Sequence, residues 1–265
     1  MHIDKIFDVF KEKQTEYHLK IDKSWTQGRT IYGGLSAALT YQAAESLVDE
    51  MSLVRSLHTN FIGPIFYDQP IVVKAEILRK GKNVTQVVSK VMQNGNICTM
   101  SQICFGINRD SKLNQPNVQS HIMKIPNKGK FIPQLPKLVP EFIQHFDLSL
   151  TKGHLAFIKS DEAHLYGWSR LKKTPNKMNI AYLIALMDVW PPTMFQLTRM
   201  PAPASTMSWN IEFIQPDLIL SPEKWIASET EARHIKDGYG HEEAKFWDQE
   251  GNLLALSRQV VAVFT

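Results

Sequence analysis

The sequence predicts an α+β fold built from two similar units, each an antiparallel sheet wrapped around one long helix. The chain has 265 residues, more than the ~100 to 150 residues of a typical single domain, so two similar units or one large domain are the natural options. Two further observations favour two units. Two short sequence segments of the first half recur in the second half, and in each half one helix precedes a run of strands.

The internal repeat consists of two short segments that recur in the same order. NFIGP at residues 60–64 and NGN at 94–96 correspond to EFIQP at 212–216 and EGN at 250–252. The offsets are 152 residues (213 minus 61) and 156 residues (251 minus 95). Offsets this similar indicate a duplicated unit with small differences in its loops.

Each half opens with a helix. In LSAALTYQAAESL, which follows Gly33 and Gly34, apolar residues recur every four positions. In the second half we expect Thr174 to cap a helix that has Pro175 at its first position and a buried stripe over residues 180–187. We expect that helix to end at Trp190-Pro191-Pro192.

Strands rich in Val, Ile, Phe and Trp follow each helix. We expect them at residues 57–61, 71–79, 84–93 and 97–105, and then at 207–213, 224–234, 242–248 and 253–264. Residues 113–148 carry Pro116, Pro126, Pro133, Pro136 and Pro140 among polar residues, which disfavours both helix and sheet. We therefore predict units at 1–112 and 149–265, joined by this connection.

Composition and charge exclude several classes of protein. The net charge of +4 is too small and too scattered for a nucleic-acid partner, although it suits an anionic small ligand. The N-terminus lacks an apolar signal region, and the longest apolar run, 181–187, is far below the ~20 residues of a spanning helix, so we expect no membrane insertion. Cys98 and Cys104 lie on one expected strand, ~20 Å apart, and cannot bridge each other. A reducing cytoplasm is the expected location.

Several segments resemble the acyl-CoA thioesterase II-like, double hot-dog thioesterases. IYGGLSAALTYQAAE resembles the Gly-Gly helix start of that family, and residues 56–95 resemble its first-half strands. YLIALMDVW, STMSWNIEFIQP and ALSRQVVAVF resemble the parts that carry its catalytic residues, which places Asp188, Thr206 and Gln259 in those roles. The chain departs from the family at Ser208, where an acidic residue is usual, and at Val260, where Glu is usual.

The resemblance implies a double hot-dog fold and hydrolysis of a fatty or short acyl-CoA to free acid and CoA, within fatty acid metabolism. It implies no cofactor beyond the CoA of the substrate, and a homodimer or higher homo-oligomer. Two rival functions remain open: a non-catalytic acyl-CoA binding or sensing protein, and an enoyl-CoA hydratase. The hydratase is less favoured, because no Asp-x-x-x-x-His helix is evident.

Hydrolysis of a thioester needs a positioned water, a base for its proton and donors for the oxyanion. The sequence has no Gly-x-Ser-x-Gly elbow, so direct attack by water is expected. Asp188 lies near a helix C-terminus beside an apolar stripe, and both features should raise its pKa. Thr206 equally suits a β-branched strand position. Gln259, amid VVAVF, requires hydrogen-bond partners.

The two halves differ at the proposed catalytic positions. The offsets place Val54 where the second half has Thr206 and Ile103 where it has Gln259, so we expect a catalytically silent first half and one site per chain. Strict alternation also places Thr206 on the side of Ser208, away from the apolar face of its strand.

The remaining candidates surround the proposed substrate. Gly33 and Gly34 offer backbone N–H groups for an oxyanion or phosphate, or alternatively form a tight turn. We include His58 as a substrate-binding candidate. Glu45 is a competing carboxylate that the resemblance does not favour. The histidines show no metal-ligand spacing, so no metal is expected. A basic cluster would bind the CoA phosphates or simply keep a hairpin soluble; it comprises Arg79, Lys80 and Lys82.

Overall fold

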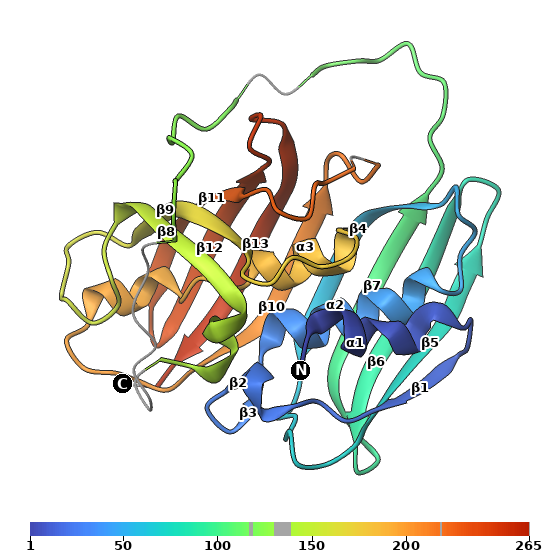
Figure 1. The fold of residues 1–265 in the computed structure, drawn as a ribbon, viewed down its shortest axis with the longest axis horizontal. Helices are drawn as coiled ribbons and strands as arrows, with labels where there is room; N and C mark the ends of the chain where they lie inside the picture. Colours follow the sequence, from blue (N-terminus) through green and yellow to red (C-terminus); the bar gives the residue numbers. More distant parts are fainter. Residues whose placement is uncertain (117–118, 130–138, 218, 265) are drawn as a thin grey trace.

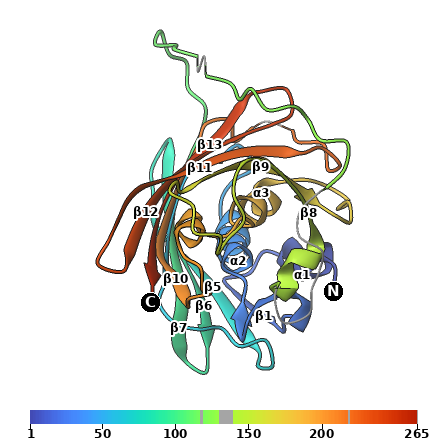
Figure 2. The same cartoon turned by 90° about the vertical axis from the view of Figure 1, so that its left-hand side faces the viewer.

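The computed structural model describes residues 1–116, 119–129, 139–217 and 219–264. Its main feature is one antiparallel sheet of eleven strands that curves around two central helices (Figures 1 and 2). The helices are α2 (Gly33–Glu45) and α3 (Ile180–Met187), and they pack against each other. This arrangement confirms the α+β prediction of two tandem hot-dog units.

The order of strands repeats from the centre of the sheet outward. The first half contributes β1 (Glu16–Leu19), β5 (Ile71–Lys80), β6 (Val84–Gln93), β7 (Asn96–Gly106) and β4 (Leu53–Phe61), in that spatial order. The second half continues with β10 (Ala204–Phe213), β13 (Leu253–Val263), β12 (Tyr239–Trp247), β11 (Ile226–Lys236), β9 (His164–Leu171) and β8 (Phe146–Gly153). The halves therefore join where β4 pairs with β10, and the order 4-7-6-5 on one side matches 10-13-12-11 on the other.

Short elements complete the fold. They are α1 (Ile3–Phe7), η1 (Asp8–Lys11), η2 (Lys23–Trp25), β2 (Thr26–Gln27), β3 (Thr30–Ile31), η3 (Glu141–His145) and η4 (Thr193–Leu197). Within the described residues, no helix is long and apolar enough to cross a membrane.

The two central helices are buried on nearly every side. Eleven consecutive residues of α2, Gly34–Ala44, are buried, and so are seven of α3, Ala181–Met187. A helix that is buried on all sides requires protein around it. The curved sheet supplies that enclosure, and the side chains on its inner face therefore meet the helices.

The structure differs from the expected elements at several places. Helix α3 starts at Ile180 rather than after Thr174, because the side chain of Asn179 accepts hydrogen bonds from the N–H groups of Ala181 and Tyr182 and caps it there. It ends at Met187, before Trp190. Strands β1, β8 and β9 were not expected from the sequence.

The connection between the halves follows the proline-rich stretch. Residues 107–116, 119–129 and 139–140 have no helix or strand, and Pro116, Pro126 and Pro140 lie among them. Pro133 and Pro136 lie outside the described residues. Strand β8 begins at Phe146, so the expected start of the second unit at residue 149 falls inside this strand.

Candidate active site

The N-terminus of α2 meets the C-terminal end of α3 at a point where no side chain could be accommodated on α2. A Cβ on Gly33 would lie 3.0 Å from Oδ2 of Asp188, and one on Gly34 would lie 2.6 Å from the hydroxyl oxygen of Tyr32 and 2.9 Å from Cβ of Asp188. Neither glycine has a positive φ. The glycine pair is therefore explained by close approach to Asp188 rather than by a tight turn.

Asp188 is the residue that ends α3. Its Oδ1 accepts a hydrogen bond from Nε2 of Gln259 at 3.1 Å, and its carboxylate also accepts one from the backbone N–H of Gly34. Burial raises the pKa of Asp188 to about 7; the two hydrogen bonds act in the opposite direction, and the charge of Glu242 raises it further. This agrees with the sequence-based expectation that burial raises the pKa of Asp188. A carboxyl group with a pKa near 7 is suited to accept a proton from water.

Thr206 and Gln259 lie on the neighbouring strands β10 and β13. Oγ1 of Thr206 donates to Oε1 of Gln259 at 3.3 Å, and Gln259 donates in turn to Asp188. The structure thus brings together all three residues that the sequence predicts as catalytic, in one chain of hydrogen bonds. Each of the three side chains is half-buried.

A β-bulge decides the direction of Thr206. Thr206 pairs with Val261 and Ser208 with Val260, so Met207 is an extra residue on β10. Thr206 consequently lies on the same face as Trp209 and Gln259, toward the helices. The expectation from strict alternation, which placed Thr206 on the side of Ser208, is wrong for this reason.

His58 does not join this site. On β4 it pairs with Asn210, whereas its neighbour Thr59 pairs with the buried Trp209. Because successive strand residues face opposite sides, His58 is exposed on the outer face of the sheet. The structure therefore does not bring His58 to the Asp188 site, where we expected it as a substrate-binding residue.

The basic cluster lies at the far end of α2 from Asp188. Lys80 forms an ion pair with Asp49 at 3.0 Å, and Asp49 follows the C-terminus of α2. With thirteen residues, α2 is about 20 Å long. Arg79, Lys80 and Lys82 are exposed and are not brought to the carboxylate of Asp188.

The positions that correspond to the site in the first half are apolar. Val54 is 2% exposed and Ile103 is fully buried. Both are packing residues of the core that surrounds α2.

The sequence interpretation missed two residues of this region. Glu242 on β12 pairs with Gln259 and is buried; its Oε1 accepts hydrogen bonds from N of Thr193 at 2.6 Å and from Oγ1 of Thr193 at 2.7 Å. Tyr32 precedes the glycine pair and donates to the carbonyl oxygen of Ala185 at 2.7 Å, which fixes the start of α2 to α3. The adjacent pair Glu242-Glu243 was a usable signal, since one of two neighbouring strand residues must face inward.

Among the residues that the structure describes, no group of three or more His, Cys, Asp or Glu side chains is arranged to hold a metal ion. The site therefore consists of a carboxylate, an amide, a hydroxyl and the first turn of a helix. These groups can position a water molecule, accept its proton and stabilise a negative oxygen.

Comparison with protein families identifies the class. Residues 21–106 match the acyl-CoA thioesterase N-terminal domain, and residues 124–263 match the acyl-CoA thioesterase C-terminal domain. The chain belongs to the acyl-CoA thioesterase family and is a thioester hydrolase. A search of curated proteins gave no match.

Solved structures share the fold over the whole chain. A hot-dog protein of unknown function from Alicyclobacillus acidocaldarius is 23% identical, with a TM-score of 0.82 and 98% of each chain covered. The acyl-CoA thioesterase II TesB2 from Mycobacterium marinum is 17% identical, with a TM-score of 0.75 and 99% and 98% of the two chains covered. A tesB protein from Mycobacterium avium subspecies paratuberculosis is 12% identical, with a TM-score of 0.74 over the full length of both chains.

Proposed function

We propose that this protein hydrolyses fatty or short acyl-CoA thioesters by direct attack of water, with Asp188 as the general base. The single observation that carries the proposal is the hydrogen-bonded series from Thr206 through Gln259 to Asp188. Burial raises the pKa of Asp188 to about 7, and a carboxyl group with such a pKa suits a general base at neutral pH.

In the proposed reaction, the oxygen of water forms a bond to the thioester carbonyl carbon while its proton passes to Asp188. Gln259 and Thr206 hold the water and the carboxylate of Asp188 in position for this transfer. The C–S bond then breaks, and the CoA sulfur leaves with the proton that Asp188 returns. Atoms balance as thioester plus water giving carboxylic acid plus thiol.

The first turn of α2 is the candidate oxyanion site. Tyr32 is the N-cap residue of α2, and its side chain accepts no hydrogen bond from the first N–H groups of the helix. These N–H groups therefore lack the side-chain partner that usually caps a helix. The N–H of Gly34 already donates to Asp188, and the partial positive charge of the helix N-terminus favours a negative oxygen nearby.

The decisive experiment follows thiol release from a panel running from acetyl-CoA to palmitoyl-CoA, with the purified full-length chain. We expect turnover with at least one member of the panel, and a rate lower by about 10² to 10⁴ after Asp188→Asn. Tight binding of acyl-CoA without thiol release would instead identify a binding or sensing protein.

Compartment and assembly form part of the same proposal. Cys98 and Cys104 are free thiols, which agrees with a reducing cytoplasm. We propose a homodimer or higher homo-oligomer in solution, which light scattering on the purified protein measures directly.

A further inference from the structure

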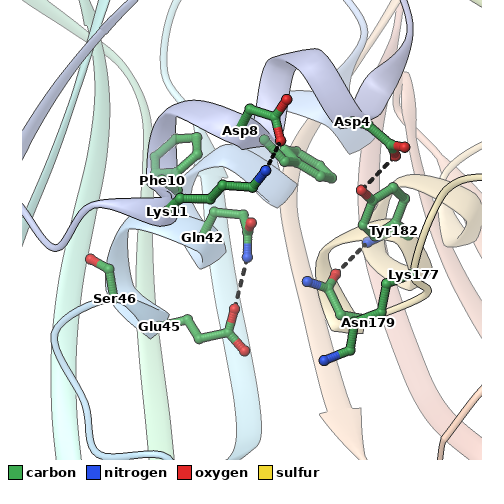
Figure 3. A pocket seen from close by; sticks show the side chains of 11 residues that line it. Asp4, Asp8, Phe10, Lys11, Gln42, Glu45, Ser46, Lys177, Asn179 and Tyr182 are labelled. Atoms are coloured by element: carbon green, nitrogen blue, oxygen red, sulfur yellow. Dashed lines mark hydrogen bonds and ion pairs between the residues drawn. The ribbon is translucent and has the colours of Figure 1, made fainter.

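A pocket lies at the opposite end of the helix pair from Asp188. It has a volume of about 240 Å³ and is bounded by the C-terminal part of α2, the start of α3 and the N-terminal segment α1–η1. Figure 3 shows side chains from these three segments facing a common space, with Gln42 and Glu45 on one side and Asn179 and Tyr182 on the other. Nothing in the proposed hydrolysis uses this pocket.

Glu45, the last residue of α2, is the carboxylate that lines the pocket between the two helices. Its Oε1 accepts from the hydroxyl of Tyr41 at 2.7 Å, and its Oε2 accepts from Nε2 of Gln42 at 2.7 Å. Both donors are neutral, and within the described part of the chain no cation forms an ion pair with Glu45. Glu45 is half-buried, and a carboxylate that loses part of its water is costly to keep charged without a positive partner. Burial also raises the pKa of Glu45. The two hydrogen bonds and the charge of Lys177 lower this pKa, but they offset the effect of burial only in part.

The other walls suit a positive group with an apolar body. Phe7, Phe10 and Tyr182 contribute aromatic surface. Asp4 and Asp8 add negative charge, and the ammonium group of Lys11 is already paired with Asp8 at 2.7 Å. Lys177, also part of the lining, is exposed to solvent. Carboxylates and aromatic rings together form the usual environment for an organic ammonium group.

We propose that this pocket binds a small primary amine, whose ammonium group pairs with Glu45 and whose carbon chain lies against Phe7, Phe10 and Tyr182. The site is separate from the Asp188 site, and the proposal holds whether or not the protein hydrolyses thioesters.

The same geometry argues against a second hydrolytic site here. At the start of α3, the side chain of Asn179 already accepts the N–H groups of Ala181 and Tyr182, so they are not available to an oxyanion. The start of α2 has no such side-chain cap. Val54 and Ile103 also supply no hydroxyl or amide from the sheet. The carboxylate therefore serves binding rather than hydrolysis.

Calorimetry with n-butylammonium chloride, and with n-butanol as the uncharged control, tests the proposal. We expect the protein to bind butylammonium and to bind butanol at least about tenfold more weakly, because a hydrogen bond between ionised groups is much stronger than one to a neutral hydroxyl. Glu45→Gln should weaken butylammonium binding by about tenfold or more, whereas Asp188→Asn at the other end should not change it.

Lys177→Ala gives a test that does not depend on the folding of the Glu45 variant. Removing this competing cation should strengthen butylammonium binding by about two- to fivefold at low ionic strength. No binding by the wild-type protein, equal binding of butanol, or weaker binding after Lys177→Ala would each overturn the proposal.

Discussion

The amide of Gln259 donates from Nε2 to Oδ1 of Asp188 at 3.1 Å and accepts from Oγ1 of Thr206 at 3.3 Å. The two contacts fix the orientation of the amide, because a flipped amide would place its oxygen against the carboxylate. Residues separated by 71 positions in the sequence are thereby held in one arrangement.

Gln259→Ala should lower kcat by at least about tenfold and leave the fold intact, because one hydrogen bond that positions the reacting groups contributes roughly 1 to 3 kcal/mol. Steady-state kinetics and circular dichroism provide the measurement. Gln102→Ala, at an exposed position of β7, is the matched control. An unchanged kcat in the Gln259 variant would remove this residue from the site.

Asp188→Asn should lower hydrolysis by the ~10² to 10⁴ typical of losing a general base, while acyl-CoA still binds. In the wild type, the base is active when ionised, so kcat should rise with pH through about 7 and then level off. Asp68→Asn, at an exposed loop position, controls for the change of residue type. A kcat that stays constant between about pH 5 and pH 8 would contradict the role of Asp188 as general base.

Thr206→Val should lower kcat by about three- to tenfold, since the variant keeps the shape of the side chain and removes only its hydroxyl. The bulge at Met207 directs Thr206 toward Gln259, whereas its exposed neighbour Ser205 faces the other side. Ser205→Ala is therefore the matched control in the same kinetic assay. Equal rates in the two variants would show that the hydroxyl of Thr206 takes no part.

Glu242→Gln should move the acidic limb of the kcat profile to lower pH. The negative charge of Glu242 is one cause of the raised pKa of Asp188, so its removal lowers that pKa. The amide oxygen of the variant can still accept from Thr193, which preserves the local structure. Glu243→Gln, on the opposite face of β12, should leave the midpoint in place; a shift to higher pH in the Glu242 variant would refute the electrostatic coupling.

Ile103→Gln should gain no second activity and should cost about 1 to 3 kcal/mol or more in the free energy of unfolding, because its amide would be buried without partners. Urea denaturation measures the stability. Titration of the wild type with a tight product analogue should give one hydrolytic site per chain. Two such sites would contradict the silent first half.

Much of this arrangement could be predicted from local sequence pattern. The apolar periodicity of α2 and the alternation in β6 located those elements, because burial on a helix or strand repeats every few residues. The site residues Asp188, Thr206 and Gln259 came from the resemblance of three segments to the thioesterase family rather than from local pattern. Strands β8 and β9 escaped prediction, since they pair with distant β11 or with each other and their stability depends on that pairing.

The sequence by itself determined the duplicated α+β plan, the two apolar helices and the residues that could perform acid–base chemistry. Only the tertiary structure decided toward which face of the sheet these side chains point. One extra residue at Met207 directed Thr206 inward, the pairing of β4 with β10 directed His58 outward, and the close approach of Gly34 to Asp188 accounted for the glycine pair. The physical reason is that a side chain's face depends on strand register and helix contact, which are set between segments far apart in the chain.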